Sequence, residues 1–330
     1  MRVLLTHNRD LLKHFYAPAA VEALRAMPGI ELVMNDSDTP LRGDALVDAA
    51  RGCEVVISDR LAAGPRAVME RLEGVKLFTR CAVDIRNIDV DAASDANILV
   101  CRCSSGYADS VGEHAIALML DLARGITRDA ERYHAGEATH PMVFGKQLAG
   151  AHVGVIGYGS IGRRIVDLAL AFRMKVSVYD PYARIDHGAV VPVGLDEVLS
   201  QPDFVVCAAY ATPETNRMMN ASAFGKMRRD AYFINISRGI LVDEDDLEAA
   251  LTSGTIAGAG LDVGDGTDEQ PSLRLARLPN VVATPHSAAL MPEPSAHQAL
   301  ETVEQVKAVL AGRLPIHAVN PHRVAGWGAR

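Results

Sequence analysis

Two successive series of short apolar runs, separated by segments of helical character, restrict this chain to a small set of folds. In the first hundred residues the helical stretches include 17–26 and 63–72. The strand-like runs are 2–6, 30–34, 53–57, 75–79 and 97–101. Runs that are apolar at nearly every position are typical of a parallel sheet that helices cover on both faces. The first series therefore predicts an α/β domain.

A long helix separates the two series. Its apolar residues recur at helical spacing between Ala108 and Arg124, and a polar segment, 125–150, follows it. Further helices are predicted at 161–172 and 243–253. The strands predicted in the second series are 153–156, 175–179, 189–193, 204–208, 231–236, 257–263 and 281–284. This pattern indicates a complete doubly wound unit.

The last predicted helix, 291–312, follows the second series too late to join its sheet, so we expect it to return and pack on the first domain. A chain of 330 residues is also too long for one ordinary core. We therefore expect an α/β protein with two doubly wound parallel-sheet domains. The expected bounds are 1–103 plus 290–330 for a discontinuous domain and 104–289 for the domain inserted into it.

Composition limits the partners and the compartment. A formal net charge of −8 argues against nucleic acid, because phosphate binding needs a basic surface, but a small anionic substrate needs only a local positive pocket. The apolar runs are short and interrupted, so no membrane span is expected. The opening residues MRVLLTHNRD turn polar too early for a signal peptide, and we expect a cytoplasmic protein.

The pattern of cysteines does not indicate a metal site. Cys53, Cys101 and Cys207 lie in apolar runs, where a reduced cysteine acts as a small hydrophobe. Cys101 and Cys103 come closest to a metal-binding pair, but no second Cys/His pair stands at ligand spacing. We expect no metal.

The strongest local motif is VGVIGYGSIGRR, residues 153–164, a G-x-G-x-x-G between a strand and a helix. Gly157 permits the tight turn, Gly159 lets the backbone approach a pyrophosphate, and Gly162 lets the helix pack on the strand. The start of the helix, with Ser160 and Ile161, would offer backbone N–H groups and the helix dipole to the phosphates. The motif predicts a dinucleotide site.

A carboxylate at the end of the next strand supports this interpretation. Asp180 lies 23 residues beyond Gly157, close to the spacing of about 20 expected for the group that binds the adenosine ribose hydroxyls. A negative charge there would repel a 2′-phosphate and favours NAD over NADP. Arg184 lies near enough in sequence to weaken that preference.

Seven stretches together resemble the D-isomer-specific 2-hydroxyacid dehydrogenase family. They fall in the order of the family and cover most of the chain from about residue 50 onward. The stretches are GYADSVGEHAIALMLDLAR (106–124), LAGAHVGVIGYGSIGRRI (148–165), FRMKVSVYDPY (172–182), ATPETNRMMN (211–220), INISRGILVDEDDLEAAL (234–251), AGAGLDV (257–263) and TPHSAA (284–289).

The resemblance implies a flavodoxin-like substrate domain interrupted by an inserted NAD domain, an active site in the cleft between them, and a homodimer. It also implies hydride transfer between the nicotinamide of NAD and a small 2-oxo or 2-hydroxy carboxylate. Such chemistry needs a cation that holds the substrate carboxylate, an acid for the carbonyl oxygen, and a carboxylate that keeps that acid protonated.

The resemblance assigns these roles to particular residues. The arginine of NISRG is Arg238 and the histidine of TPH is His286, and both would also contact cofactor and substrate. Further cofactor contacts are implied at Thr212 and Asp262. Because Arg238 and His286 are both retained, an enzyme is favoured over a catalytically inactive protein.

The third catalytic residue departs from the family pattern. The family usually has a glutamate five residues after the aspartate of the LDV-type stretch, just before a proline. Counting from Asp262 gives Thr267, within the longer segment GDGTDEQP. Glu269, two residues before the proline, is the best candidate, and Asp268 and Asp265 are the alternatives.

The substrate loop also departs from the pattern. Where the family has a glycine-rich segment that holds the carboxylate, this chain has Val83 and Asp84, the predicted substrate contacts. Since Asp84 would repel an anionic substrate, we expect it to turn away or to pair with Arg86 or Arg102. Two interpretations remain: an internal ion pair, or a pocket rebuilt for an unusual polar or anionic substrate.

Two other functions remain as alternatives. One is the oxidation of an anion that is not a hydroxy acid, such as formate or phosphite, which some members of the superfamily perform. The other is a non-catalytic NAD-sensing protein, favoured only by the irregular acidic loop.

Overall fold

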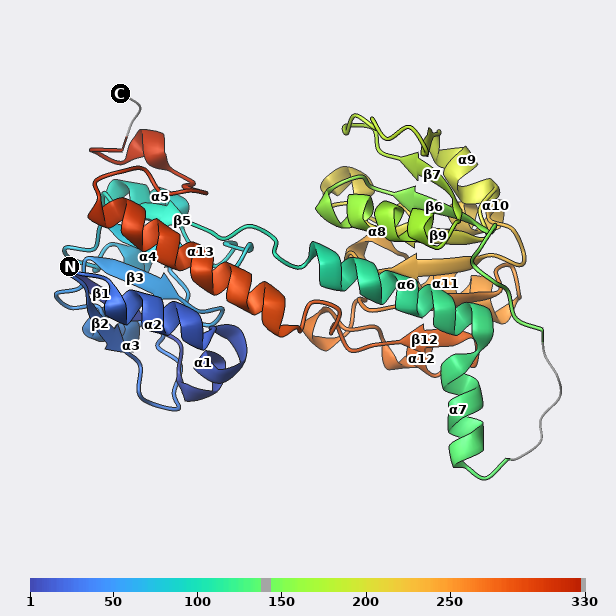
Figure 1. Cartoon of the computed structure of the whole chain (residues 1–330), viewed down its shortest axis with the longest axis horizontal. Helices are drawn as coiled ribbons and strands as arrows, with labels where there is room; N and C mark the ends of the chain where they lie inside the picture. The colour runs from blue at the N-terminus through green and yellow to red at the C-terminus, as the bar shows by residue number, and fades with distance from the viewer. Residues whose placement is uncertain (138–143, 328–330) are drawn as a thin grey trace. The chain divides into compact units, whose positions relative to one another are not determined.

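The computed structural model of the chain describes residues 1–137 and 144–327 (Figure 1). The chain folds into two compact units, Met1–Gly106 with Leu290–Arg330 and Tyr107–Ala289. The first unit is thus discontinuous and the second is inserted into it. The first junction follows Gly106, whereas the sequence analysis placed it after residue 103.

The discontinuous unit is built on a parallel sheet with the strand order β2-β1-β3-β4-β5. This is the order of flavodoxin-like folds. All five predicted strands are confirmed, with ends displaced by up to two residues. The strands are β1 (Arg2–Leu5), β2 (Glu31–Met34), β3 (Val55–Ser58), β4 (Leu77–Arg80) and β5 (Leu99–Cys101).

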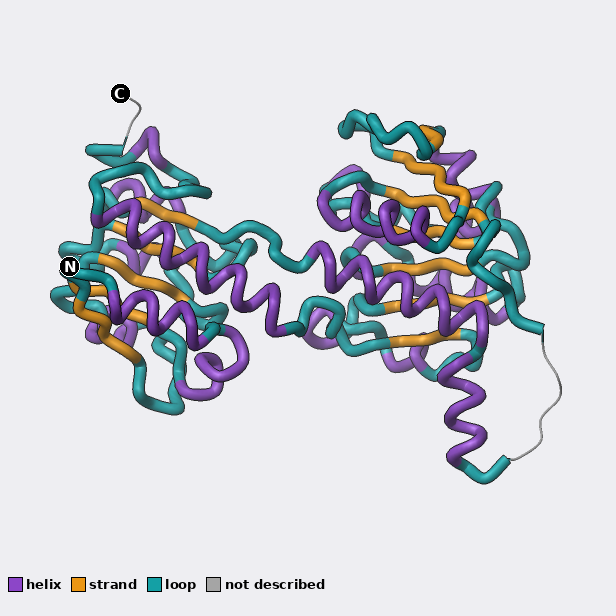
Figure 2. The backbone as a smooth tube through the Cα atoms, in the orientation of Figure 1, coloured by secondary structure: helices purple, strands orange, loops and turns teal. Residues whose placement is uncertain are grey.

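Helices cover both faces of this sheet (Figure 2). One face packs on α2 (Pro18–Ala26) and α13 (Pro292–Leu310), and the other on α3 (Asp44–Ala49), α4 (Arg66–Met69) and α5 (Val90–Asp95). The contacts of α13 with α2 and β4 confirm that the last helix returns to the first domain.

The predicted helix 63–72 is wrong in extent. The helix α4 spans only Arg66–Met69. Its N-cap is Pro65, and the residue before a proline avoids helical backbone angles, so the helix begins after Pro65 and not at residue 63. Two short helices that periodicity missed, α1 (Arg9–Phe15) and α5, begin at capping side chains. The Asn8 side chain accepts a hydrogen bond from the Leu11 N–H, and that of Asp89 from the Ala92 N–H.

The inserted unit has a seven-stranded parallel sheet with the order β12-β11-β10-β9-β6-β7-β8. The strand order reverses between β6 and β9, as in dinucleotide-binding folds, where the ligand binds at this reversal. All predicted strands are confirmed. They are β6 (His152–Ile156), β7 (Lys175–Tyr179), β8 (Val191–Pro192), β9 (Phe204–Cys207), β10 (Tyr232–Asn235), β11 (Gly258–Leu261) and β12 (Val281–Ala283).

The strand predicted at 189–193 is reduced to the two residues of β8 at the edge of the sheet. Pro192 has no N–H to donate, and proline is tolerated in a sheet only at such an edge. The long helix α6 (Ala108–Arg124) has the predicted bounds and packs against α8 (Ser160–Ala171) and β11. Gly125, with φ of 65°, separates it from α7 (Ile126–His134).

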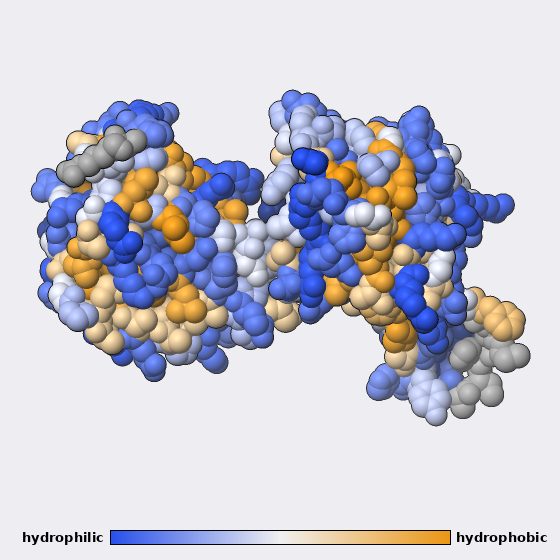
Figure 3. Space-filling view, turned by 45° about the horizontal axis from the view of Figure 1, so that its top comes forward, coloured by the Kyte–Doolittle hydropathy of each residue, from blue (hydrophilic) through white to orange (hydrophobic). Residues whose placement is uncertain are grey.

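On the other face of the inserted unit lie shorter helices, and their apolar residues form a second core. They are α9 (Leu195–Ser200), α10 (Ala221–Lys226), α11 (Glu244–Thr252) and α12 (Leu273–Ala276). On the face drawn in Figure 3 most of the surface is hydrophilic, with apolar side chains in patches. No helix in the described residues is long and apolar enough to cross a membrane.

A buried asparagine fixes the chain after α13 to the edge of the first sheet. Asn320 Oδ1 accepts a hydrogen bond from the Val100 N–H at 2.8 Å, and its Nδ2 donates to the Ile98 carbonyl at 3.0 Å. The neighbouring Val319 N–H donates to the Val100 carbonyl at 2.8 Å. These contacts satisfy backbone groups that the edge strand β5 would otherwise leave unpaired.

We expect Asn320→Ala to lower the free energy of unfolding of the discontinuous unit by about 1–3 kcal/mol, since it leaves buried backbone groups without partners. Denaturant unfolding followed by circular dichroism measures this. Asn87→Ala is the control, because Asn87 is exposed and donates one long bond of 3.4 Å. An Asn320→Ala curve superimposed on that of the control would contradict the proposed role.

Candidate active site

Two glycines of the predicted dinucleotide motif are required by backbone contacts. Gly157 follows β6 with a φ of 99°, and a Cβ there would lie 2.7 Å from the Ala208 carbonyl oxygen. A Cβ on Gly162 would lie 2.1 Å from the carbonyl oxygen of Gly157. The turn therefore sits at the reversal point between β6 and β9, and α8 packs against the turn itself.

Gly159 is different, because the nearest atom to a Cβ there belongs to Tyr210 and is 3.5 Å away. Packing in the described structure does not require this glycine, which fits a position that a ligand approaches. Gly159 is the N-cap of α8, and no described side chain caps the helix. The first turn of the helix begins at Ser160 and Ile161, and the positive end of the helix dipole lies there. This end of α8 suits a pyrophosphate.

Asp180 follows β7 and is fixed by three backbone donors. Its Oδ2 accepts from the Tyr158 N–H at 2.7 Å, and its Oδ1 from the N–H groups of Tyr182 and Ala183, both at 2.9 Å. Burial raises the pKa of Asp180, but these hydrogen bonds outweigh it and the net shift is downward. A carboxylate offers about four acceptor positions, so capacity for a ribose hydroxyl remains.

An arginine beside Asp180 was not identified from the sequence. The Arg163 guanidinium lies 4.2 Å from the centroid of the Tyr158 ring, and its charge also lowers the pKa of Asp180. Arg163 immediately follows the third glycine of the motif. Its place directly after that glycine, in the first turn of α8, was the signal that the sequence offered. Arg184, considered from the sequence, is exposed.

Arg238 and Glu269 lie together. Arg238 follows β10, and its backbone carbonyl accepts from Asn235 Nδ2 at 3.0 Å. Its Nε lies 3.4 Å from Glu269 Oε2, with the two side chains 41% and 42% exposed. A Cβ on Gly239 would lie 2.2 Å from the carbonyl carbon of Gly264, so the two loops approach backbone to backbone. The half-exposed pair can therefore face a ligand.

The acidic loop after β11 folds on itself around Glu269. The Gly264 N–H donates to the Glu269 carbonyl at 3.0 Å, and the Gly266 N–H donates to the Gln270 carbonyl at 2.8 Å. Thr267, the position counted from the family spacing, begins a 3₁₀ turn that ends at Glu269. The φ of Glu269 is 60°, a region that side chains rarely adopt.

The other two carboxylate candidates differ from Glu269. The Asp265 N–H donates to the nearly buried carboxylate of Glu244 at 3.1 Å, and burial, followed by the charge of Glu244, raises the pKa of Asp265. Asp265 thus faces the start of α11. The side chain of Asp268 lies outside the described residues.

His286 lies in the loop after β12, and a buried carboxylate holds that loop. Asp262 is 2% exposed and accepts from Thr284 Oγ1 at 2.7 Å and from the N–H groups of Ser287 and Ala288 at 2.9 and 3.1 Å. The His286 N–H donates to the Asp262 carbonyl at 2.9 Å. His286 has a φ of 53°, so it is, like Glu269, a candidate catalytic residue whose backbone is in the left-handed region.

A histidine on α6 supports the same loop, and the sequence did not single it out. His114 Nε2 lies 2.9 Å from Thr284 Oγ1 and 3.6 Å from Asp262 Oδ1. Its only signal was its place in the stretch GEHAIAL. Thr212, a predicted cofactor contact, is exposed after β9, and its hydroxyl caps the turn Pro213–Thr215.

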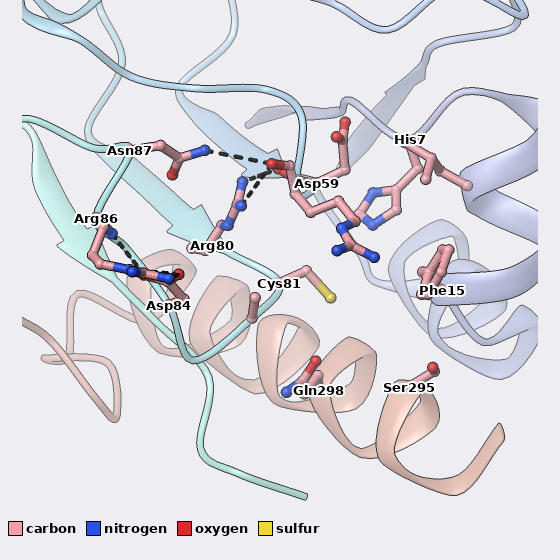
Figure 4. A pocket seen from close by; sticks show the side chains of 13 residues that line it. His7, Phe15, Asp59, Arg80, Cys81, Asp84, Arg86, Asn87, Ser295 and Gln298 are labelled. Atoms are coloured by element: carbon pink, nitrogen blue, oxygen red, sulfur yellow. Dashed lines mark hydrogen bonds and ion pairs between the residues drawn. The ribbon is translucent and has the colours of Figure 1, made fainter. Parts of the chain in front are cut away.

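The discontinuous unit has a pocket of its own, a cavity of about 570 Å³ (Figure 4). The pocket lies at the carboxyl ends of β1, β3 and β4. The strand order of this sheet reverses between β1 and β3, and in such sheets a ligand binds at the reversal. Polar and sulfur-bearing residues that line it include His7, Asp59, Arg60, Arg80, Cys81, Asp84 and Arg86.

Asp84 pairs with Arg86, which confirms one of the expected outcomes. The Arg86 Nη2 donates to Asp84 Oδ2 at 2.8 Å, and its Nε contacts both carboxylate oxygens. The Arg86 hydrogen bond lowers the pKa of Asp84 more than burial raises it. Val83 is half-buried beside this pair, and Arg102 is exposed at the end of β5. The carboxylate is therefore neutralised within its own loop.

Comparison with known proteins agrees with this geometry. Residues 116–288, more than half of the chain, match the family described as D-isomer specific 2-hydroxyacid dehydrogenase, NAD binding domain. The chain is 34% identical over 241 residues to a hydroxypyruvate reductase of Thermotoga maritima, covering 72% of this chain and 79% of that protein.

Two further relatives extend the likeness. A D-3-phosphoglycerate dehydrogenase of Methanocaldococcus jannaschii is 33% identical over 287 residues, 86% of this chain and 54% of that protein. The chain spans about half the length of the phosphoglycerate dehydrogenases that it matches.

The structure of a D-isomer specific 2-hydroxyacid dehydrogenase from Lactobacillus delbrueckii ssp. bulgaricus in its NAD complex superposes with a TM-score of 0.82. It has 26% identity and covers 97% of this chain and all of that one. The sequence match, the two parallel sheets and the glycine turn at the reversal point agree with one another. The chain belongs to the D-isomer specific 2-hydroxyacid dehydrogenase family, and its unit Tyr107–Ala289 contains the NAD-binding domain of that family.

Proposed function

We propose that this protein is an NAD-dependent dehydrogenase that interconverts a small 2-hydroxy carboxylate and its 2-oxo form. The observation that carries the proposal is the half-exposed Arg238–Glu269 ion pair, in the same unit as the dinucleotide turn and the His286 loop. In this proposal Arg238, His286 and Glu269 are the catalytic residues.

NAD is the cofactor of this domain, and the residues present fit it. The turn of Gly157, Gly159 and Gly162, with the N–H groups of Ser160 and Ile161, would hold the pyrophosphate, and Asp180 would bind the adenosine ribose. Thr212, Asp262, Arg238 and His286 would complete the cofactor contacts. When bound, the reduced cofactor supplies the hydride. The protein supplies the anion clamp and the proton.

Arg238 is suited to clamp the substrate carboxylate. Its Nε faces Glu269, and one Nη donates to the Ser237 carbonyl at 2.7 Å. Guanidinium presents five N–H donors in a planar fork, so these two contacts leave the rest of the fork to bind a planar carboxylate. Glu269 thereby also fixes the orientation of the fork.

His286 would donate the proton to the carbonyl oxygen during reduction and accept it during oxidation. A carboxylate near an imidazole stabilises its protonated form, and we assign that part to Glu269. Asp262 and Thr284 hold the loop that carries His286, so the backbone from which the imidazole projects is in place before substrate binds.

The substrate is best described as a small 2-oxo or 2-hydroxy carboxylate. Contact with it through Val83 and Asp84 stays a prediction of the family resemblance. Oxidation of formate or phosphite, and NAD sensing without catalysis, are the alternatives. The Arg238–Glu269 pair favours a hydroxyacid enzyme over a sensor, because a binding protein needs no carboxylate beside its anion clamp.

We also propose a cytoplasmic homodimer without nucleic-acid partners. All five cysteines are buried free thiols, as is usual for a protein of a reducing compartment. Ile126, Tyr133 and Phe144 are 55%, 75% and 97% exposed on or near α7, an apolar surface suited to a second subunit.

We expect a preference for NAD over NADP that depends on Asp180. In Asp180→Ala the efficiency with NAD should fall about tenfold or more, because a hydrogen bond to a charged group contributes about 1.5–3 kcal/mol. The efficiency with NADP should fall less or rise, since the repulsion of a 2′-phosphate is removed. Steady-state kinetics with both cofactors measures the ratio, and equal wild-type efficiencies would refute the assignment.

We expect His286→Ala to lose about 10²–10⁴-fold in turnover of a 2-oxo acid, the usual contribution of a positioned general acid. Binding of NADH, measured by fluorescence titration, should change far less. Turnover near that of the wild type would assign the proton to another group.

We expect Glu269→Gln to move the fall in reduction rate with rising pH to lower pH, because an imidazolium without its carboxylate neighbour loses its proton sooner. Asp265→Asn and Asp268→Asn are matched controls in the same loop. If only Asp268→Asn shifted the profile, the catalytic carboxylate would be Asp268, and if none did, the assignment of a loop carboxylate would be wrong.

A further inference from the structure

Two cysteines of the discontinuous unit lie side by side at the carboxyl end of its sheet. The Cys103 Sγ lies 3.3 Å from the carbonyl oxygen of Arg80, which directly precedes Cys81. The Cys103 N–H donates at 2.9 Å to the carbonyl of Ala82, which directly follows Cys81, so Cys103 contacts the backbone on both sides of Cys81.

A histidine from a third strand end joins these thiols. His7 follows β1, is 2% exposed, and its Nδ1 has no hydrogen-bond partner in the described part of the chain. Its ring lies 4.9 Å from that of Tyr16, centroid to centroid. A buried, unpartnered ring nitrogen has a stability cost, which favours a role toward a transient ligand or proton.

The groups around Cys81 favour its thiolate. A hydrogen bond from the Cys103 thiol lowers the pKa of Cys81, burial opposes this shift, and His7 and Arg80 lower the pKa further. The same hydrogen bond, together with burial, raises the pKa of Cys103. The geometry agrees with this difference, because Cys81 lines the pocket whereas the Cys103 thiol is within hydrogen-bond distance of two backbone carbonyl oxygens.

Cys81 has the largest exposed fraction of the five cysteines, 8% against at most 1% for the others. It lines the pocket of the discontinuous unit, and its sulfur points into that pocket (Figure 4). Cys53, Cys101 and Cys207 are buried, and burial raises the pKa of each. Cys103 lies behind Cys81, where its Sγ lies 3.3 Å from the carbonyl oxygens of Arg80 and Gln298.

We propose that Cys81 and Cys103 form a peroxide-reactive dithiol, with Cys81 as the nucleophile and Cys103 as the resolving thiol. The site is independent of the proposed dehydrogenase activity, which uses neither residue. The substrate for this modification is a small hydroperoxide, hydrogen peroxide being the simplest.

The reaction balances in two steps. The Cys81 thiolate attacks one oxygen of hydrogen peroxide, the O–O bond breaks, and hydroxide leaves and takes up a proton to form water, giving a sulfenic acid on Cys81. The Cys103 thiol then attacks that sulfur, the S–O bond breaks, and a second water leaves. The dithiol loses two electrons and two protons, and peroxide is reduced to two waters.

Oxidation would act on the neighbouring loop. Cys81 directly precedes the segment 82–87 that carries the Asp84–Arg86 pair. A disulfide would remove the Cys103 thiol from its contacts with Arg80 and with Gln298 of α13. The ends of β4 and β5 would then be tied to each other instead of to the helix.

To test the proposal, the protein (residues 1–330) is treated with hydrogen peroxide and the remaining thiols are blocked with N-ethylmaleimide. Linked peptides are then identified by mass spectrometry. We expect a Cys81–Cys103 disulfide that dithiothreitol reverses, formed at least about tenfold faster than any oxidation of Cys53, Cys101 or Cys207. Those cysteines are internal controls in the same digest. Oxidation of all five at similar rates, or none at Cys81, would overturn the proposal.

Variants separate the two roles. Cys103→Ser should accumulate a sulfenic acid on Cys81 that dimedone traps, and Cys81→Ser should leave Cys103 unreactive. Reaction of Cys103 in Cys81→Ser at the wild-type rate would overturn the assignment of the nucleophile.

One further measurement can be made on the unsubstituted protein and therefore does not depend on whether the cysteine variants fold. The rate of Cys81 alkylation by iodoacetamide should reach half its maximum at a lower pH than for an ordinary cysteine, and His7→Asn should move that midpoint upward. A midpoint at or above that of free cysteine would refute the thiolate.

Discussion

The candidate catalytic groups depend on one close approach between two backbone segments. The loops after β10 and β11 meet where Gly239 lies against Gly264, at a separation that leaves no space for a Cβ on residue 239. Across this contact the Arg238 guanidinium reaches the Glu269 carboxylate. Both loops start at the ends of adjacent parallel strands, so the sheet brings the two loops together.

A buried carboxylate extends the same arrangement to the next strand. Asp262 lies at the end of β11, and the unfavourable burial of its charge is offset by a hydroxyl and two backbone N–H groups from the loop after β12. That loop holds His286 at a positive φ, and Glu269 is held in the same backbone region. Such conformations are unfavourable by about 1–3 kcal/mol each and persist where the surroundings determine them. The loops after three neighbouring strands thus carry the three candidate catalytic residues, Arg238, Glu269 and His286.

The sequence predicted the fold well because parallel strands that are buried on both faces are apolar throughout. Every predicted strand is present, and the return of α13 to the first unit followed from its place after the last strand. The helix expected at 63–72 failed at Pro65, and the strand at 189–193 shrank around Pro192, so proline limited both elements. Short capped helices such as α1 were missed because seven residues carry too little periodicity.

The site was harder to predict, for a physical reason. The glycine motif and Asp180 have fixed spacing, because they belong to one strand–turn–helix–strand unit. The carboxylate beside Arg238 lies in an irregular loop, where counting from Asp262 gave Thr267 while the folded turn brings Glu269 to the arginine. The contacts of His114, and those of Cys103 with the backbone around Cys81, join segments that are apart in sequence, and no local pattern encodes them.

One measurement tests the central claim most directly. The purified protein is mixed with NADH and a panel of 2-oxo acids that differ in the group distal to the carboxylate, and the loss of NADH absorbance is followed. We expect at least one 2-oxo acid to be reduced to a 2-hydroxy acid with one equivalent of NADH consumed. If NADH binds by calorimetry but no 2-oxo acid is reduced, or if only formate or phosphite is turned over with NAD, the claim is contradicted.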